Sequence, residues 1–346
     1  MTEPLSTAEA ATLFEPLRHA SSLVLAVSGG PDSVALMRLA AALQARSGLP
    51  PLVIATVDHG LAAGSDAIAR DVVTQAASLG LAAHVLRWDG DKPRTGLQDA
   101  ARVARYALLE ALASRIGATH LVTAHTLDDQ AETVLFRLAR GSGPAGLAGM
   151  RPMSRRGEVF LCRPLLGVPK ARLVATCRAA AWPYVVDPAN ADPRFARARL
   201  RGLLPQLAAE GLGAATLALL GARLARDEAA LHEASAACRS ACLVEATERR
   251  QAFAGGPFMA APAAVRLRLL EAALTDFAKP GPPRLARLEA LAEDLGQAFA
   301  AARPLRRTLH GARITLAPNG RIDLAPEGPR HRGMGVRHMV GGALDA

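Results

Sequence analysis

The sequence contains few cysteines, very little lysine and no long apolar run. Four cysteines among 346 residues are too few for a disulfide framework. No apolar stretch approaches the ~18 residues that a membrane-spanning helix needs. The first twenty residues include three glutamates and lack the basic and then apolar pattern of a signal peptide. We therefore expect a cytoplasmic protein without a membrane partner.

Arginine supplies nearly all of the positive charge. Only three of the 41 basic residues are lysine, and the net charge is +10. A basic balance is typical of proteins that bind nucleic acid, although the coding composition of the genome is an alternative source of the same bias. Half of the residues are apolar, which excludes general disorder and allows sizeable cores in two domains.

Short runs rich in valine and leucine alternate with amphipathic stretches over the first 140 residues. The runs predict strands, and the stretches with apolar residues three and four apart predict helices. This alternation is typical of an α/β fold with a parallel, doubly wound sheet, in which ligands bind beyond the carboxyl ends of the strands. The predicted strands cover 23–27, 52–57, 82–86 and 119–124, and the predicted helices cover 33–45, 65–79, 97–116 and 128–140.

The pattern is less regular in the rest of the chain. The glycine-rich stretch 141–149 predicts a mobile loop, and the proline-rich segment 151–201 predicts irregular structure. Alanine- and leucine-rich sequence then predicts helices over 207–274 and 283–302. The later part of the chain is therefore expected to be mainly helical.

A β-hairpin is predicted near the end of the chain, because Pro318-Asn319-Gly320 separates two alternating segments, 305–316 and 321–324. A change of composition near residue 210 predicts a domain boundary. The predicted parts are an α/β domain over 1–210, a smaller and mainly helical domain ending in the hairpin over 211–330, and a disordered tail over 331–346.

The sharpest motif, Ser28-Gly29-Gly30-Pro31-Asp32-Ser33, lies directly between a predicted strand and a predicted helix. Two glycines allow the backbone to turn tightly and to approach a ligand, and the amide groups at a helix start favour an anion. We therefore predict that this loop binds phosphate, the alternative being an ordinary strand-to-helix turn. Asp32 would repel a phosphate unless it also binds Mg²⁺ or orients a reacting group. The loop is not a Walker A motif, because no lysine follows its glycines.

Two further polar groups follow predicted strands. Asp58-His59-Gly60 ends the second strand, where an acid contacts a ribose in other nucleotide-binding folds, although a simple turn explains it equally well. The other group follows the fourth strand and consists of His125, Asp128, Asp129 and Glu132. Helix capping explains one of these acids, but not a histidine with three acids beside a phosphate loop. We therefore predict that this group binds Mg²⁺ or the ammonium group of an amine substrate.

Arginines form the last candidate sites. Three of them, Arg194, Arg197 and Arg201, have helical spacing, and Arg199 lies between them. A run of charge is usually a solvated face, but an arginine cluster next to a phosphate site favours contact with a polyanion. Arg102, on the predicted helix 97–116, is placed either to reach nucleotide phosphates or to form a surface salt bridge.

Together these motifs resemble those of a known family. The segment from Leu25 to Ser33 resembles the PP-loop of N-type ATP pyrophosphatases, which split ATP into AMP and pyrophosphate. Over roughly residues 20–205 the combined motifs resemble the tRNA(Ile)-lysidine synthetase family. The other motifs that carry this resemblance are Asp58-His59-Gly60-Leu61, Ala101-Arg102, Arg105-Tyr106, His125–Thr133, Arg137-Leu138-x-Arg140-Gly141-x-Gly143, Arg163-Pro164-Leu165-Leu166 and Asp187-Pro188-x-Asn190.

The resemblance implies an RNA-modifying ligase. The family uses ATP to adenylate the C2 oxygen of the wobble cytidine in tRNA(Ile) with a CAU anticodon, and L-lysine then displaces AMP to give lysidine. ATP and Mg²⁺ are the implied cofactors, domain 211–330 is implied to bind or support the tRNA, and a homodimer is a further expectation.

The resemblance also implies roles for residues of this sequence. Ser28–Ser33, with Asp58 and Arg102, would bind ATP, and Asp32 would assist Mg²⁺ or orientation. His125 and the acids Asp128, Asp129 and Glu132 would serve the chemistry, with acids among them binding lysine or metal. The arginines Arg194, Arg197, Arg199 and Arg201 would face the RNA or the activated intermediate.

The sequence departs from the family pattern at two positions. Thr126 stands where the family has a second histidine, and Ala198 stands where it has an asparagine. Two alternative functions are weighed. A tRNA thiolase on the same ATP chemistry would need catalytic or cluster-binding cysteines, and the cysteine spacing argues against them. A non-catalytic ATP-binding or RNA-binding protein would not need Asp32 together with the acidic group.

Overall fold

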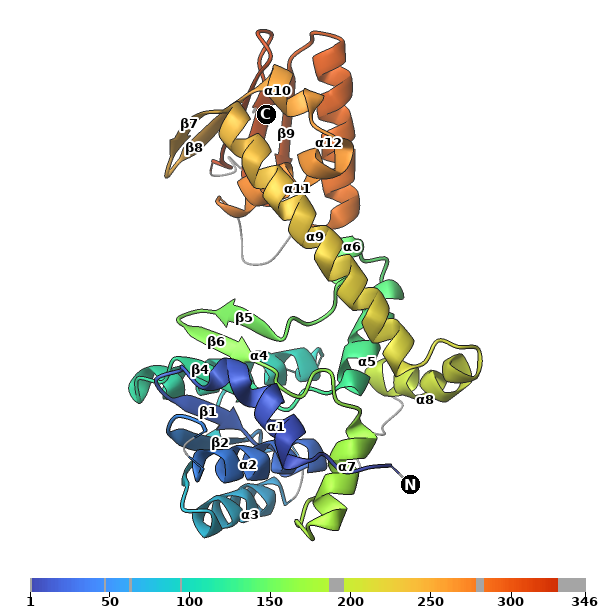
Figure 1. Ribbon diagram of the computed structural model, residues 1–346. Helices are drawn as coiled ribbons and strands as arrows, with labels where there is room; N and C mark the ends of the chain where they lie inside the picture. Colours follow the sequence, from blue (N-terminus) through green and yellow to red (C-terminus); the bar gives the residue numbers. More distant parts are fainter. Residues whose placement is uncertain are drawn as a thin grey trace, which may run out of the picture. The chain divides into compact units, whose positions relative to one another are not determined.

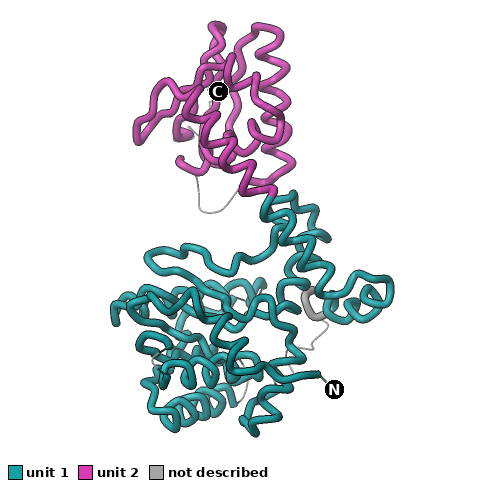
Figure 2. Tube along the Cα trace, in the orientation of Figure 1, with its two compact units in different colours: residues 1–226 teal, residues 227–346 magenta. Residues whose placement is uncertain are grey.

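The computed structural model describes residues 2–46, 48–61, 64–93, 95–186, 196–277 and 283–328, without the side chains of 196–198. The chain divides into two compact units, Met1–Arg226 and Asp227–Ala346 (Figure 2), and the division falls within helix α9 (Ala214–Cys242). The predicted boundary near 210 lies upstream of this division, and the assignment of a function to each domain stays a prediction. The predicted tail, 331–346, lies outside the described residues.

The first unit is built on a six-stranded sheet (Figure 1). Its strands are β1 (Leu23–Ala26), β2 (Leu52–Asp58), β3 (Ala82–Arg87), β4 (His120–Thr123), β5 (Met153–Arg156) and β6 (Val159–Cys162). Their order is β3-β2-β1-β4-β6-β5, and all neighbours are parallel except β5, which is antiparallel to β6. The predicted parallel α/β fold is confirmed.

Helices cover both faces of this sheet. The helices of the unit are α1 (Thr7–Phe14), α2 (Pro31–Gln44), α3 (Ser65–Ser78), α4 (Leu97–Arg115), α5 (Leu127–Leu138), α6 (Pro144–Leu147), α7 (Lys170–Ala179), α8 (Ala196–Ala209) and the first part of α9, and α8 and α9 pack against α5. In β1, Leu23 and Leu25 pack in the core that α2, α3 and α7 cover, whereas Val24 and Ala26 pack in the core that α4 covers. Because both faces are buried, β1 is apolar at every position instead of alternating.

The strand order places the two strongest sequence motifs together. β1 pairs in parallel with β2 on one side and with β4 on the other, so the sheet reverses its winding between β1 and β4. Ligands of doubly wound sheets bind at this switch point, beyond the carboxyl ends of the strands. The phosphate loop follows β1 and the acidic group follows β4, so the fold brings both to one edge.

Residues 151–186 are more regular than predicted. β5 and β6 form a hairpin, and β6 pairs with β4 through the register His120↔Phe160. Val159, Leu161 and Cys162 are buried, which explains why this short segment joins the sheet. The prediction of irregular structure was therefore wrong here, because a four-residue strand between glycines and prolines carries too little periodicity to be recognised.

The predicted loop over 141–149 contains the short helix α6. Arg137 ties this segment down, since its Nη1 donates to the carbonyl oxygens of Gly146 at 2.6 Å and Gly149 at 3.0 Å. Gln130 adds two bonds to the backbone of Met150. The connection is thus held by side chains from α5, which the glycine content alone does not reveal.

The second unit contains a five-stranded antiparallel sheet in the order β7-β8-β11-β10-β9. Its strands are β7 (Leu243–Thr247), β8 (Arg250–Ala254), β9 (Leu305–Leu309), β10 (Ala312–Leu316) and β11 (Arg321–Pro326), and its helices are α10 (Gly255–Ala260), α11 (Ala263–Thr275) and α12 (Leu285–Ala300). Leu288, Leu291 and Leu295 of α12 share one core with alternate residues of β10 and β11. The hairpin around Asn319-Gly320 is confirmed, with Gly320 at φ +81°.

Two details of the second unit differ from the predictions. The stretch 207–274, predicted to be helical, contains β7 and β8. The segment 305–316 is divided into β9 and β10 by a turn, where His310 and Gly311 have φ of +55° and +82°. Among the described residues no single helix is long and apolar enough to cross a membrane. Helices α8 and α9 reach the required length and apolar content only when counted together, and they are sharply bent at the break between them.

Candidate active site

The predicted phosphate loop, Ser28–Ser33, is a hydrogen-bonded turn between β1 and α2. Ser33 Oγ donates to the carbonyl oxygen of Gly30 at 2.9 Å and accepts from the backbone nitrogen of Ser28 at 3.1 Å. The backbone nitrogen of Val185 donates to Gly29 O at 2.9 Å. These bonds hold the loop in shape from both sides, so the described residues alone fix its conformation.

The two glycines of the loop differ in whether the backbone conformation requires glycine at that position. Gly29 has φ +84°, and an added Cβ would lie 2.8 Å from Cγ2 of Ile68. Gly30 is the N-cap of α2 in an extended conformation, and its added Cβ would meet nothing closer than 3.9 Å. Gly29 is therefore required by the backbone, whereas Gly30 leaves the approach to the helix start open. In the described part of the chain, no side chain caps α2.

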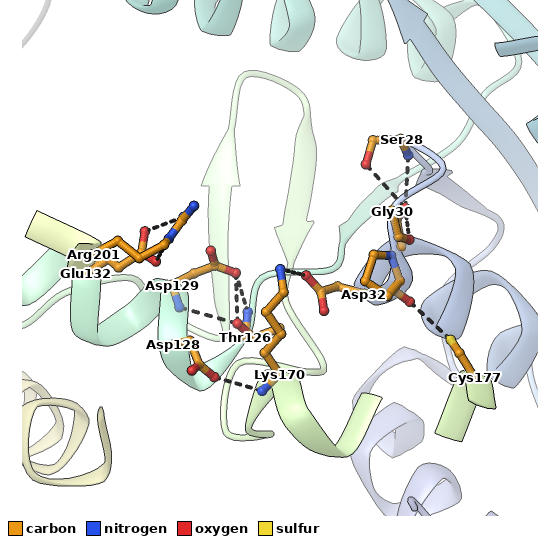
Figure 3. A network of polar contacts seen from close by, with 12 residues as sticks. Ser28, Gly30, Asp32, Thr126, Asp128, Asp129, Glu132, Lys170, Cys177 and Arg201 are labelled. Atoms are coloured by element: carbon orange, nitrogen blue, oxygen red, sulfur yellow. Dashed lines mark hydrogen bonds and ion pairs between the residues drawn. The ribbon is translucent and has the colours of Figure 1, made fainter. Parts of the chain in front are cut away.

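Asp32 lies in the first turn of α2 and has one partnered and one unpartnered oxygen (Figure 3). Its Oδ2 accepts from Nζ of Lys170 at 2.8 Å. Its Oδ1 is buried and has no hydrogen-bond partner within the described residues. Burial raises the pKa of the Asp32 carboxyl above its ordinary value, and the Lys170 ammonium opposes that shift. An orphaned carboxylate oxygen beside a phosphate loop suits a divalent cation.

Thr126 and Asp129 cap the start of α5. The Thr126 backbone nitrogen donates to Asp129 Oδ2 at 2.8 Å, and the Asp129 nitrogen donates to Thr126 Oγ1 at 3.3 Å. This reciprocal arrangement is a capping box. Thr126 is fully buried. Thr126, which departs from the family pattern, and Asp129 both therefore stabilise the start of α5.

The remaining polar residues of α5 and the segment before it also have partners. Asp128 Oδ2 accepts from the backbone nitrogen of Lys170 at 2.7 Å. Glu132 is held by Arg201 of α8, with Nε to Oε1 at 2.5 Å and Nη2 to Oε2 at 2.8 Å. His125 Nδ1 lies 2.8 Å from Oγ1 of Thr123. Figure 3 shows these acids with their partners: Lys170 joins Asp32 to Asp128, while Asp129 pairs with Thr126 and Glu132 pairs with Arg201.

Asp58 and Arg102 lie on other elements of the same unit, at the end of β2 and within α4. Asp58 Oδ1 accepts from Ser65 Oγ at 2.7 Å and from the Gly60 nitrogen at 2.9 Å, and the bond from Ser65 is the main cause that lowers the pKa of Asp58. The carboxylate therefore stabilises the turn after β2. Arg102, on α4, stacks over the ring of Tyr106, with 5.2 Å from its Cζ to the ring centroid.

The predicted arginine group is only partly described. Arg194 lies outside the described residues, and the side chain of Arg197 on α8 lies outside them as well. Arg199 is exposed on α8. Arg201 reaches the acidic group, where its bond to Glu132 raises the pKa of its guanidinium. Within the described residues, Arg201 thus joins the predicted arginine group to the predicted acids.

Sequence reasoning missed Lys170, which contacts both the phosphate loop and the acidic helix. It follows Pro169 and begins α7. The available signal was a lysine at a helix start, Pro169-Lys170, but the prediction of irregular structure over this segment concealed the helix. Among the described residues, no group of three or more His, Cys, Asp or Glu side chains is arranged to hold a metal ion.

A tightly bonded glycine loop after the first strand, at the switch point of a parallel sheet, is typical of α/β proteins that bind nucleotides. The PP-loop domain family matches residues 3–207. The tRNA(Ile)-lysidine synthase of Methylobacterium sp. (strain 4-46) is 54% identical over 337 residues, covering 95% of this chain and 97% of that protein. The one of Rhodopseudomonas palustris is 50% identical with the same coverage. The chain belongs to the tRNA(Ile)-lysidine synthase family.

A comparison of structures agrees on the fold. The U34-tRNA thiolase NcsA from Methanococcus maripaludis matches with a TM-score of 0.53 over 63% of this chain and 77% of that chain. Its sequence identity is 17%, so this likeness shows a shared fold and nothing about the reaction.

Proposed function

We propose that this protein joins L-lysine to C2 of the wobble cytidine of tRNA(Ile) with a CAU anticodon, using ATP and releasing AMP and pyrophosphate. The observation that carries the proposal is the sequence identity of 54% to a tRNA(Ile)-lysidine synthase over 95% of this chain. The PP-loop at the switch point and the acidic group beside it supply the chemistry that such a reaction needs.

The first half-reaction activates the base. The cytidine C2 oxygen attacks the α-phosphorus of ATP, the bond to the β-phosphate oxygen breaks, and pyrophosphate leaves. Ser28–Ser33 would hold the triphosphate at the start of α2, where amide groups and the helix dipole stabilise negative charge. Because the C2 oxygen is a poor leaving group, attaching AMP to it makes the next step possible.

Mg²⁺ is proposed to bind at Asp32. The buried Oδ1 of Asp32 lacks a protein partner within the described residues, which suits a hard cation. Magnesium is usually held by one or two carboxylates together with substrate phosphates, so a single aspartate is sufficient. The ion would neutralise charge on the triphosphate and on the pyrophosphate that leaves.

The second half-reaction forms the carbon–nitrogen bond. The ε-amine of lysine, after losing a proton, attacks C2, and the bond from C2 to the oxygen that carries AMP breaks. We propose that Asp128 and Asp129 attract the lysine ammonium and that His125 lies close enough to exchange its proton. Glu132 already holds Arg201, so we propose that Glu132 positions this arginine toward the RNA or the adenylated intermediate.

Several further assignments belong to the same proposal. Asp58 and Arg102 are proposed to contact ATP, and Arg194, Arg197 and Arg199 are proposed to contact tRNA. The second unit is proposed to bind or support the tRNA, and its arginine-lined sheet face suits that function. A cytoplasmic location and a homodimer stay predictions; sedimentation of the purified protein would test the dimer.

The rival thiolase function has less support. A thiolase needs a sulfur donor, and cysteine thiolates or a cluster commonly supply or hold it. Burial raises the pKa of the Cys162 and Cys177 thiols to about 11, which disfavours the thiolate form that such chemistry needs. Cys177 also donates to the carbonyl oxygen of Pro31, which gives it a structural use.

One assay tests the proposal. Purified protein is mixed with labelled lysine, ATP, Mg²⁺ and a transcript of tRNA(Ile) with the CAU anticodon, and label in the RNA is measured together with AMP and pyrophosphate. We expect incorporation that depends on all four components. A transcript with uridine in place of the wobble cytidine should take up no label. Equal labelling of both transcripts, or labelling without release of AMP, would refute the proposal.

A further inference from the structure

Lys170 connects the two halves of the candidate site. It is the first residue of α7, directly after Pro169. Its backbone nitrogen donates to Asp128 Oδ2 at 2.7 Å, and its Nζ donates to Asp32 Oδ2 at 2.8 Å (Figure 3). One residue therefore contacts the helix after β4 and the loop after β1, which are the two elements that meet at the switch point.

The backbone around Lys170 is fixed, but its side chain is not enclosed. Val168 O accepts from the Leu127 nitrogen at 3.0 Å, and Cys177, further along α7, donates to Pro31 O at 3.4 Å. These bonds anchor α7 to both α5 and α2. The Lys170 side chain itself is 51% exposed, whereas that of Asp32 is 18% exposed. The ammonium thus lies at the open side of the loop.

Stability alone is a weak reason for a cation at this place. An ion pair with one partner half exposed contributes little, because water screens it and ordering a long side chain opposes it. Ligand binding is a stronger reason, since a negatively charged Asp32 beside a phosphate loop repels a triphosphate. The ammonium has three N–H groups, and within the described residues Asp32 is the hydrogen-bond acceptor for its Nζ. The other two N–H groups of the ammonium can donate to a ligand.

We propose that Lys170 is a phosphate-binding residue of the ATP site, whose ammonium bridges the Asp32 carboxylate and the triphosphate. This inference rests on the proposed function, because it takes ATP as the ligand of the loop. A compact charge on a flexible stem suits this use, since it can follow the phosphate while staying near Asp32. The loop supplies neutral amide donors, and Lys170 supplies a mobile charge from a third element.

Nucleotide binding to the full-length protein tests the inference without tRNA or lysine. Dissociation constants of adenosine, AMP, ADP and ATP are measured by calorimetry in the presence of Mg²⁺ for wild type and Lys170→Ala. We expect the variant to bind ATP about tenfold more weakly, the size of one charge-assisted hydrogen bond, and to bind adenosine as the wild type does. Equal ATP affinity, or an equal loss for adenosine and ATP, would overturn the inference.

A double variant distinguishes two possible effects of Lys170, direct contact of its ammonium with phosphate and neutralisation of the Asp32 charge. If Lys170 only cancels the charge of Asp32, then Lys170→Ala has no effect in an Asp32→Asn background. If its ammonium contacts the triphosphate, the Asp32→Asn/Lys170→Ala protein binds ATP about tenfold more weakly than Asp32→Asn alone. Equal affinities of these two proteins would leave Lys170 a purely electrostatic partner of Asp32 and refute the proposal.

The matched control is Arg178→Ala, which removes an exposed cation from the last turn of the same helix. It should leave every nucleotide affinity unchanged, and circular dichroism checks that all variants are folded. Failure of the proposed function is distinguishable. If the wild-type protein binds no ATP, the proposed ATP site as a whole is contradicted. If the wild-type and Lys170→Ala proteins bind ATP with equal affinity, only the role of Lys170 is contradicted.

Discussion

The guanidinium of Arg201 and the carboxylate of Glu132 form a bidentate ion pair, with hydrogen bonds of 2.5 Å and 2.8 Å. The Glu132 side chain is 11% exposed and the Arg201 side chain is 45% exposed. Removing the arginine therefore leaves a nearly buried charge without its partner. We expect Arg201→Ala to lower the free energy of unfolding by about 2 kcal/mol. Urea denaturation followed by circular dichroism measures this difference.

The chain offers a matched control for this pair. Arg18 and Glu15 pair on the surface, with side chains that are 50% and 57% exposed, so Arg18→Ala should cost less than about 0.5 kcal/mol. Replacing both members of the inner pair, in Arg201→Ala/Glu132→Gln, should cost less than the sum of the single changes. Additive effects would mean that the two side chains do not stabilise each other.

The fold was predictable, and so was the meeting of the two main candidate site motifs, because their signals are local. Ser28–Ser33 and the group from His125 to Glu132 each lie within one strand-loop-helix unit, and the parallel topology then determines that they meet. Lys170 could not be predicted in the same way. Its contact with Asp32 joins residues 138 positions apart and depends on a hairpin, β5–β6, whose strands have four residues each. Short strands carry little periodicity, and their pairing is decided by tertiary packing.

The acids near the site illustrate a second limit. Their sequence pattern predicts a cluster of charge, but it does not show which oxygens are already used. Asp129 caps α5, Asp128 holds the start of α7 and Asp58 closes a turn. Each of these bonds depends on backbone geometry that residue type alone does not determine. A capping role and a functional role for such residues are therefore compatible.

Two neighbouring glycines give a prediction that separates folding from function. Gly29→Ala forces a side chain onto a backbone at φ +84° and against Ile68, so we expect it to lower the free energy of unfolding by about 1–3 kcal/mol. Gly30→Ala meets ordinary contact distances and should leave stability within about 1 kcal/mol of wild type. Its new methyl group stands at the open start of α2, so ATP binding should weaken.

Thermal denaturation and ATP calorimetry on the two glycine variants give both readouts. The expected result is a loss of stability for Gly29→Ala and a loss of ATP affinity without unfolding for Gly30→Ala. Full ATP affinity in folded Gly30→Ala protein would show that the ligand does not approach this part of the loop.

Asp32→Ala should abolish turnover while leaving the fold intact. Its carboxylate is held beside the phosphate loop, and removal of one such charged group from a transition-state site commonly costs at least about 100-fold in rate. Burial raises the pKa of Asp32, which means that the folded state disfavours its charged form and gains no stability from it. The half-exposed Lys170 ammonium can be hydrated when its partner is removed. The melting temperature should therefore not fall.

The lysine-incorporation assay and a thermal scan check this prediction. Asp89→Ala removes an exposed acid from the loop after β3 and is the control, expected to match wild type in both measurements. Turnover by Asp32→Ala at the wild-type rate would remove the assignment of the loop to the reacting phosphate.

The N-terminal segment should make stability depend on pH. Arg172 donates to both carboxylate oxygens of Glu9, and this bond is the main cause that lowers the pKa of Glu9 from 4.5 to about 2. A carboxyl group whose pKa is lower in the folded state stabilises the fold above its ordinary pKa, and that contribution is lost as the pH falls from 4.5 toward 2. Arg172→Ala removes it at neutral pH.

Melting temperatures of wild type and Arg172→Ala are therefore expected to differ most near neutral pH and to converge as the solution is made acidic. Some difference should persist, since Arg172 also donates to the carbonyl oxygens of Glu3 and Pro4. Salt should reduce the pH-dependent part, because Glu9 is exposed. Arg178→Ala serves as the control on α7. A difference that is constant with pH would contradict the ion pair as its source.

The outer face of the second unit's sheet is the place to test tRNA contact. Ala312, Ile314 and Leu316 of β10 pack in the core with α12, so Arg313 between them points to the opposite face. Arg306 of β9 lies opposite Thr315 in the register and shares that face. A groove on this face is lined by four arginines and one acid, which are Arg249, Arg250, Arg306, Arg313 and Asp323.

Asp323 already pairs with Arg250, so the remaining arginines give this face a net positive charge that suits an RNA backbone. We expect Arg306→Ala/Arg313→Ala to weaken tRNA binding about tenfold or more while ATP affinity stays unchanged. The slope of log K against log salt is negative, and its magnitude should decrease by roughly 0.7–0.9 for each phosphate that the variant no longer neutralises. Arg287→Ala changes an exposed residue of α12, on the helical side of the sheet, and should change neither quantity. If the double variant binds tRNA with wild-type affinity and salt slope, this face supports the fold without touching the RNA.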